Sequence, residues 1–174
     1  EESLSGAPVV ATTDPTADWQ TYTNDEYGFS FKYPVQWLVK EQFDCEGSCV
    51  VRANLLHKKG DKNNSLSDTY INFMGVNYQS QDLPIETHLE NLGFQVYESA
   101  KATLDDTEGI FFNDGGGLSG YVYTKAVKRN RYFYAASYSP VLLQASLGAG
   151  TKEVGKVSVD NIYNQILSTF KFTE

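Results

Sequence analysis

Residues 22–37, with the sequence YTNDEYGFSFKYPVQW, hold the densest run of aromatic residues in the chain. Phe29, Phe31 and Tyr33 alternate with polar residues, so the three rings share one face of a predicted strand. A turn sequence with an asparagine, an aspartate and a glycine precedes this strand. Pro34 ends it, because proline cannot donate a ladder hydrogen bond. The tryptophan that follows is placed to fold back on the rings.

The second strong pattern lies at the other end of the chain. Apolar residues recur there at helical spacing for three turns: Val159, Ile162, Tyr163, Ile166, Leu167 and Phe170. Ser158 is in position to cap this predicted helix. We expect the apolar face of the helix to bury the early aromatic rings, and the predicted architecture depends on that contact.

Strand patterns dominate the chain between these two ends. The predicted strands are residues 38–43, 50–56, 69–78, 95–104, 109–113, 120–127 and 131–138. One short helix is predicted after Pro84, with Gly93 at its C-terminal end. Short turns between neighbouring strands favour an α+β domain, an antiparallel sheet with helices packed on it. Residues 19–174 are predicted to form one domain, and the polar, proline-punctuated residues 1–18 a flexible tether.

The charge of the chain restricts its partners. Its 174 residues carry a net charge of −8, which argues against a nucleic-acid partner or an anionic membrane surface. No apolar run is long enough to span a bilayer. Attachment to a membrane is therefore expected only through an anchor upstream of the first residue.

The two cysteines indicate a compartment. Cys45 and Cys49 are separated by Glu-Gly-Ser, and a disulfide across so short a loop is feasible where Gly47 forms a hairpin tip. Metal binding is the rival reading, but two thiolates without a nearby histidine supply half a zinc site at best. We favour a disulfide, and with it an extracytoplasmic location at the cell surface, in the periplasm or outside the cell.

Sequence patterns for catalysis are weak. Ser119 lies in GLSG at residues 117–120, but the spacing of a nucleophile elbow is broken and a strand pattern follows. For the two histidines, His57 and His88, we expect structural roles. We expect no enzyme, no catalytic residue and no cofactor. A hydrolase that uses Ser119, with His88 or another group as its base, remains an alternative.

Four acidic residues gather around one predicted turn: Asp105, Asp106, Glu108 and Asp114. Such a group could hold a divalent ion weakly, but solvated turn acids are the commoner reading. We expect no metal site, and leave a weak cation site near the first three of them open.

A predicted hairpin in the C-terminal half carries the most ambiguous surface. Its tyrosines are Tyr121, Tyr123, Tyr132, Tyr134 and Tyr138, of which the first four are the candidate binding surface. Rings that pack under the helices are core, whereas rings that face solvent offer a platform for sugar or peptide. The basic residues of this hairpin are Lys125, Lys128, Arg129 and Arg131, of which the last three are the candidate partner surface. These basic residues either protect the hairpin tip from edge pairing or dock an acidic partner. Together with the tyrosine platform, they make an unknown protein or a cell-envelope glycan the expected partner.

The two ends of the chain resemble PsbP-like domains. The resemblance rests on YGFSFKYPVQW at residues 27–37 and IYNQILSTFKF at residues 162–172. It implies an antiparallel sheet with helices on both sides. For bacterial proteins with this opening it also implies export, often with a lipid anchor.

The resemblance assigns no site residue. The family includes an extrinsic subunit of the oxygen-evolving complex, whose functional residues lie outside the matched stretches. The cysteine hairpin departs from the photosynthetic members, so we do not expect a photosystem role. The leading interpretation is a non-catalytic extracytoplasmic binding or accessory module. A carbohydrate- or cell-wall-binding domain that uses the tyrosine hairpin is the alternative.

Overall fold

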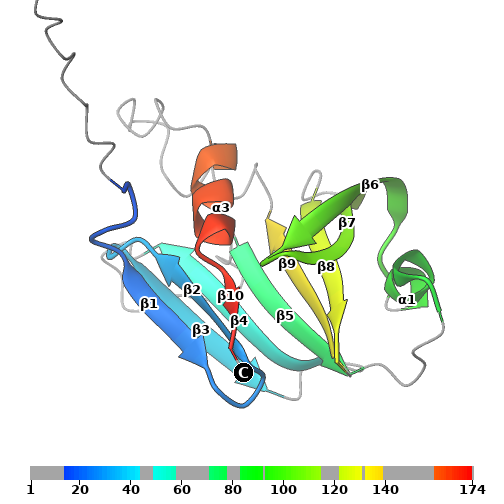
Figure 1. Cartoon of the computed structure of the whole chain (residues 1–174), viewed down its shortest axis with the longest axis horizontal. Helices are drawn as coiled ribbons and strands as arrows, with labels where there is room; N and C mark the ends of the chain where they lie inside the picture. Colours follow the sequence, from blue (N-terminus) through cyan, green and yellow to red (C-terminus); the bar gives the residue numbers. More distant parts are fainter. Residues whose placement is uncertain are drawn as a thin grey trace, which may run out of the picture.

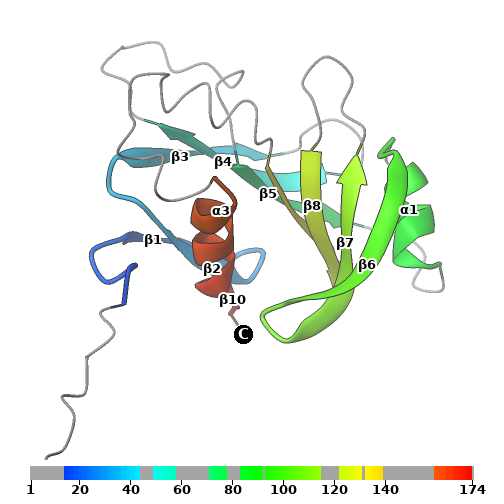
Figure 2. The same ribbon diagram turned by 90° about the horizontal axis from the view of Figure 1, so that it is seen from above.

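A computed structural model describes most of the chain. The described residues are 14–43, 49–57, 71–77, 83–91, 93–114, 122–130, 132–138 and 159–173. Within them the strands form two antiparallel sheets, accompanied by two helices (Figures 1 and 2). No helix among these residues has the length and apolar character needed to cross a bilayer.

The large sheet has seven strands, all paired antiparallel. Their order across the sheet is β3 (Trp37–Phe43), β4 (Cys49–His57), β5 (Ile71–Asn77), β9 (Tyr132–Tyr138), β8 (Val122–Arg129), β7 (Thr107–Asp114) and β6 (Val96–Leu104). Hairpins therefore run from β6 through β9, and β9 closes the sheet against β5. The small sheet has the order β1 (Gln20–Asn24), β2 (Phe29–Tyr33) and β10 (Lys171–Phe172).

The early aromatic strand and the last helix, α3 (Val159–Ser168), meet as predicted. Phe29 and Phe31 are each 1% exposed. Phe29 stacks on Phe170 just after α3, with ring centroids 5.8 Å apart. Phe31 stacks at 4.2 Å on Phe73 of the large sheet. The small sheet and α3 thus share one face of the large sheet, and the expected core contact is confirmed.

The second helix, α1 (Ile85–Asn91), covers the opposite face. Alternation along β9 sends Tyr134 toward the α3 face, whereas Phe133 joins Leu89 of α1 in a separate apolar cluster. Figure 2 shows α1 beside the β6–β7 end of the sheet and α3 at the small sheet. Gly93, at φ +87°, ends α1 in the left-handed conformation that its sequence predicts. The antiparallel α+β architecture with helices on both faces is confirmed.

The ends of the chain differ from the prediction in two respects. The sequence QTYTN was not predicted as a strand, because it carries one large apolar residue, yet it forms β1 along the edge of β2. Helical spacing extended to Phe170, but α3 ends at Ser168 and the chain turns into β10. Thr169 marks this boundary, because its hydroxyl donates to the Ile166 carbonyl and accepts the Lys32 N–H.

The start of the described chain forms a turn. The Asp14 carboxylate accepts hydrogen bonds from the backbone N–H and the hydroxyl of Thr16, at 2.9 and 2.8 Å. Thr16 is 4% exposed. These residues lie inside the range 1–18 expected to act as a tether; residues 1–13 are outside the described part, and the domain boundary stays a prediction.

Candidate functional site

The candidate site begins with a row of rings on the face of the large sheet that α3 covers. Tyr123 of β8 lies directly opposite Tyr138 of β9, and their ring centroids are 5.5 Å apart. Phe111 of β7 stacks on Tyr123 at 5.8 Å, with 6° between the ring planes. Side chains of neighbouring strands stand side by side on one face, so the β7–β8–β9 hairpins produce a continuous row.

The helix α3 adds a fourth ring above this row. Tyr163 stacks on Tyr138 with ring centroids 4.1 Å apart. Its hydroxyl donates a 2.7 Å hydrogen bond to the Ala136 carbonyl of β9, and only 2% of the residue is exposed. Burial raises the pKa of Tyr163 above its usual value, so the hydroxyl stays protonated as the donor. The ring is therefore held in place by packing and by a buried hydrogen bond.

An open hollow of about 340 Å³ lies where this row meets α3. We call it the aromatic hollow, and its lining residues are Phe111, Tyr123, Tyr138, Tyr163 and Asn164. Tyr138 and Tyr163 are buried and form its fixed inner wall, whereas Asn164 is exposed. Phe111 and Tyr123 are half-buried at its rim. The lining side chains among the described residues are all uncharged: rings, phenol hydroxyls and one carboxamide.

A buried amide stands next to this row. Asn113 lies directly opposite Tyr123 in the ladder and two residues beyond Phe111, so the three side chains share a face. The Asn113 Oδ1 atom is buried and accepts no hydrogen bond within the described part of the chain. Buried amide oxygens are normally paired, so this end of the row holds unused hydrogen-bonding capacity.

The predicted tyrosine surface is divided by the structure. Of its members, Tyr123 lines the aromatic hollow. Tyr132 is half-buried and makes an edge-to-face contact with Tyr27, with ring centroids 5.6 Å apart. Tyr134 is 7% exposed and donates its hydroxyl to the Tyr27 carbonyl at 2.7 Å. Burial raises the pKa of Tyr134 to about 12, and the ring belongs to the core. Tyr121 lies outside the described residues.

The predicted basic cluster is likewise not one patch. The Lys128 ammonium donates to the Leu83 carbonyl ahead of α1. The Arg129 guanidinium lies 4.5 Å from the centre of the Phe172 ring of β10, which is a cation–π contact. The two side chains leave opposite faces of β8, since they are neighbours in a strand. Arg131 is outside the described residues.

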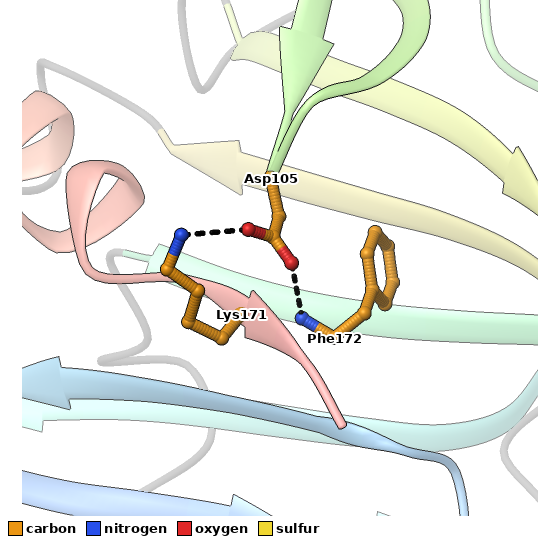
Figure 3. A network of polar contacts seen from close by, with 3 residues as sticks. All are labelled: Asp105, Lys171 and Phe172. Atoms are coloured by element: carbon orange, nitrogen blue, oxygen red, sulfur yellow. Dashed lines mark hydrogen bonds and ion pairs between the residues drawn. The ribbon is translucent and has the colours of Figure 1, made fainter. Parts of the chain in front are cut away.

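The acidic turn forms a clasp, which we define as Asp105 with Lys171 and Phe172 (Figure 3). Asp105 Oδ1 lies 2.7 Å from the Lys171 ammonium, and Oδ2 accepts the Phe172 backbone N–H at 2.7 Å. Partial burial disfavours the carboxylate, but these hydrogen bonds outweigh burial and hold the pKa of Asp105 below its usual value. Asp106 and Glu108 are exposed. The described residues contain no cluster of three or more side chains suited to a metal ion.

Several predicted features lie beyond the described ranges. These are Cys45 with its pairing to Cys49, and the serine pattern around Ser119. The disulfide therefore stays a prediction. His88 is described: it is 8% exposed and sits within α1, where it was expected to be structural.

Sequence reasoning selected one hollow residue, Tyr123, as a candidate surface residue and named Tyr138 only as another tyrosine of the same hairpin. Tyr138 continues the alternation of Tyr132 and Tyr134, which was a usable signal. Tyr163 was assigned to the core face of the last helix, where it does lie, but its place in the inner wall of the hollow was not foreseen. Phe111 and Asn164 carried no pattern that separates them from ordinary strand and helix residues.

Comparison with known proteins supports the fold. No family model and no curated protein matches the chain. Among solved structures it is similar to the solution structure of a cyanobacterial PsbP, CyanoP from Synechocystis sp. PCC 6803. The two share 10% sequence identity and superpose with a TM-score of 0.50, over 96% of this chain and 98% of the other. The likeness extends over nearly the whole of both chains, and what it establishes is a PsbP-like α+β fold.

Proposed function

We propose that this protein is a non-catalytic, extracytoplasmic accessory module that binds an uncharged ligand in the aromatic hollow. It belongs, in this proposal, to the bacterial exported type, held at the membrane by an anchor upstream of the tether at residues 1–18. The observation that carries the binding role is the hollow itself, about 340 Å³ in volume and lined by four rings and an amide. Small-ligand sites are typically concave, mostly apolar and supplied with a few placed polar groups.

The hollow is suited to binding because its walls are formed in advance. Tyr163 is fixed by its hydrogen bond to the Ala136 carbonyl, and Tyr138 is 5% exposed between Tyr163 and Tyr123. A ligand that enters therefore orders few side chains. The conformational entropy that binding usually costs is reduced accordingly.

The lining supports a role without catalysis. The described lining carries no imidazole, carboxylate, amine or thiol, and these groups perform most general acid–base catalysis. An accessory role agrees with the fold, although one fold hosts many functions. The hydrolase alternative would need Ser119, outside the described residues, to lie near a base.

The binding role is tested by NMR titration of the ¹⁵N-labelled full chain. The probes are neutral tetrasaccharides and a capped phenylalanine peptide. We expect shifts of backbone amides at Phe111, Tyr123 and Asn164, with Phe43 on β3, at the opposite edge of the sheet, as the internal reference. Tyr123→Ala removes one wall and should abolish these shifts, whereas Phe43→Ala should not. If neither class of probe shifts the hollow amides, the binding role is rejected.

The location is tested by the state of the thiols. The closely spaced Cys45 and Cys49 support an oxidising, extracytoplasmic compartment. Cells that produce the full-length protein are quenched with acid, alkylated and analysed by mass spectrometry. We expect the Cys45–Cys49 disulfide in most molecules. Two alkylated, free thiols would argue against the proposed compartment.

A further inference from the structure

We infer that the ligand of the aromatic hollow is a neutral glycan, of which one sugar ring enters the hollow. This inference rests on the proposed function, because it takes the hollow as the binding site and names the chemistry that fits it. The volume of the hollow and the polarity and charge of its lining together select this class of ligand.

The volume limits what can enter. About 340 Å³ is near the lower end of the range found for small-molecule pockets, roughly 300–1,000 Å³. One six-membered ring with its substituents fits such a space, and the open mouth lets the rest of a chain continue outside. Tyr138 and Tyr163 close the inner end, so the hollow takes the end or one unit of a chain.

The polarity of the rim favours a hydroxylated ring over an apolar group. The Tyr123 phenol and the Asn164 carboxamide stand at the rim, where an entering ligand removes water from them. An apolar side chain would cover these groups without replacing the lost hydrogen bonds, and that costs free energy. A sugar ring presents apolar C–H faces to the aromatic rings and hydroxyls to the phenol and the amide.

The charge of the lining favours a neutral sugar. In the part of the chain that the structure describes, no side chain that lines the hollow is charged, and the chain as a whole carries −8. An anionic sugar would therefore enter a negatively charged protein without a cation to pair with in the hollow. Lys125 lies directly opposite Phe111 in the ladder but does not line the hollow. Its removal should leave the affinity for a neutral glycan unchanged.

The test uses the full chain and three classes of probe. Neutral probes are chitotetraose, cellotetraose and maltotetraose; an alginate tetramer is the anionic probe, and a capped phenylalanine peptide is the apolar probe. Dissociation constants are measured by NMR titration. We expect one or more neutral tetrasaccharides to bind at the hollow amides, and both other probes to bind at least tenfold more weakly.

Variants at the rim separate sugar from apolar binding. Tyr123→Phe and Asn164→Ala each remove one hydrogen-bonding group and should weaken the neutral tetrasaccharide about threefold to tenfold. Phe43→Ala, on β3 at the opposite edge of the sheet, and Asn91→Ala, at the end of α1 on the opposite face, are the controls on exposed residues and should change nothing. Lys125→Ala tests the charge argument in the same assay.

The outcomes distinguish this inference from the proposed function. The glycan inference is overturned if the hollow binds the phenylalanine peptide more tightly than every tetrasaccharide and Tyr123→Phe binds that peptide as tightly as the parent does. The binding role stands in that case. If the alginate tetramer binds most tightly and Lys125→Ala loses affinity for it, the inference that the ligand is neutral is overturned. If no probe shifts the hollow amides, both statements fall.

Discussion

Asp105 at the tip of the β6–β7 hairpin is joined to Lys171 of β10 by a 2.7 Å ion pair, although the two residues are 66 positions apart. The same carboxylate accepts the Phe172 N–H, so one side chain ties the large sheet to the last strand of the small sheet. The two sheets are thereby fastened at the C-terminal end of the chain, on the side where Phe172 packs into the core.

Replacement of the clasp carboxylate should weaken the domain. Asparagine keeps the left-handed backbone of Asp105, at φ 45°, but loses the charge that strengthens both hydrogen bonds. We expect Asp105→Asn to lower the free energy of unfolding in urea by about 1 kcal/mol. Asp106→Asn, in the same turn at φ 59° and exposed, is the control and should change little. Equal losses in the two variants would show that the clasp adds nothing to the turn.

The contribution of the clasp should depend on pH in a defined direction. The pKa of Asp105 is lowered in the folded protein relative to its ordinary value of 3.8. The stabilisation is therefore complete above the unfolded pKa and is lost as the pH falls through the folded pKa. The difference in melting temperature between the parent and Asp105→Asn should be constant from about pH 7 to about pH 5 and shrink toward about pH 2. A difference that grows on acidification would contradict this assignment.

Local patterns predicted the elements, whereas the site depends on contacts between distant segments. The alternation of Phe29 and Phe31 suffices to predict a strand with one buried face, and Gly93 to predict the end of a helix. The strand β1 was missed because its residues are mostly polar and it is stabilised by pairing with β2. Tertiary pairing overrode a weak local preference there.

The aromatic hollow was beyond prediction for a related reason. Tyr123 and Tyr138 meet only because the hairpin register places them opposite each other, and a shift by one residue would turn one ring to the other face. Tyr163 reaches the hollow because α3 packs on the sheet at this place, and no local pattern encodes that placement. The same holds for Asp105 and Lys171, whose charges gave no sign that they would pair.

Two glycines should differ in how they tolerate alanine. Gly28 and Gly93 both have positive φ, +65° and +87°. A Cβ on Gly28 would lie 3.0 Å from the Thr173 carbonyl oxygen, whereas nothing lies within 4 Å of a Cβ on Gly93. We expect Gly93→Ala to cost about 1 kcal/mol of unfolding free energy, the backbone term alone.

Gly28→Ala should cost more, because it also disturbs the strand pairing at the end of β10. Thr173 donates its N–H to the Gly28 carbonyl at 3.0 Å, so both chains would have to move. Urea unfolding of the two variants gives the comparison. Equal losses would mean that β10 adjusts without cost.

The hydroxyls of Tyr163 and Tyr123 should separate stability from binding. Tyr163 donates to the Ala136 carbonyl in the core, so Tyr163→Phe should lower the free energy of unfolding by about 1–2 kcal/mol. Its ring remains in the wall of the hollow, so the affinity for the neutral tetrasaccharide should stay within about twofold of the parent's. The loss of one hydrogen bond to the ligand would change the affinity by more than that.

Tyr123→Phe should have the opposite effects, because the Tyr123 hydroxyl stands at the half-exposed rim. Its unfolding free energy should match the parent, whereas its affinity for the tetrasaccharide should fall. Urea unfolding and NMR titration on the same two preparations make the comparison. A loss of stability in Tyr123→Phe would mean that the Tyr123 hydroxyl stabilises the folded protein. A loss of affinity in a folded Tyr163→Phe would mean that the ligand reaches the inner wall and competes for the bond to Ala136.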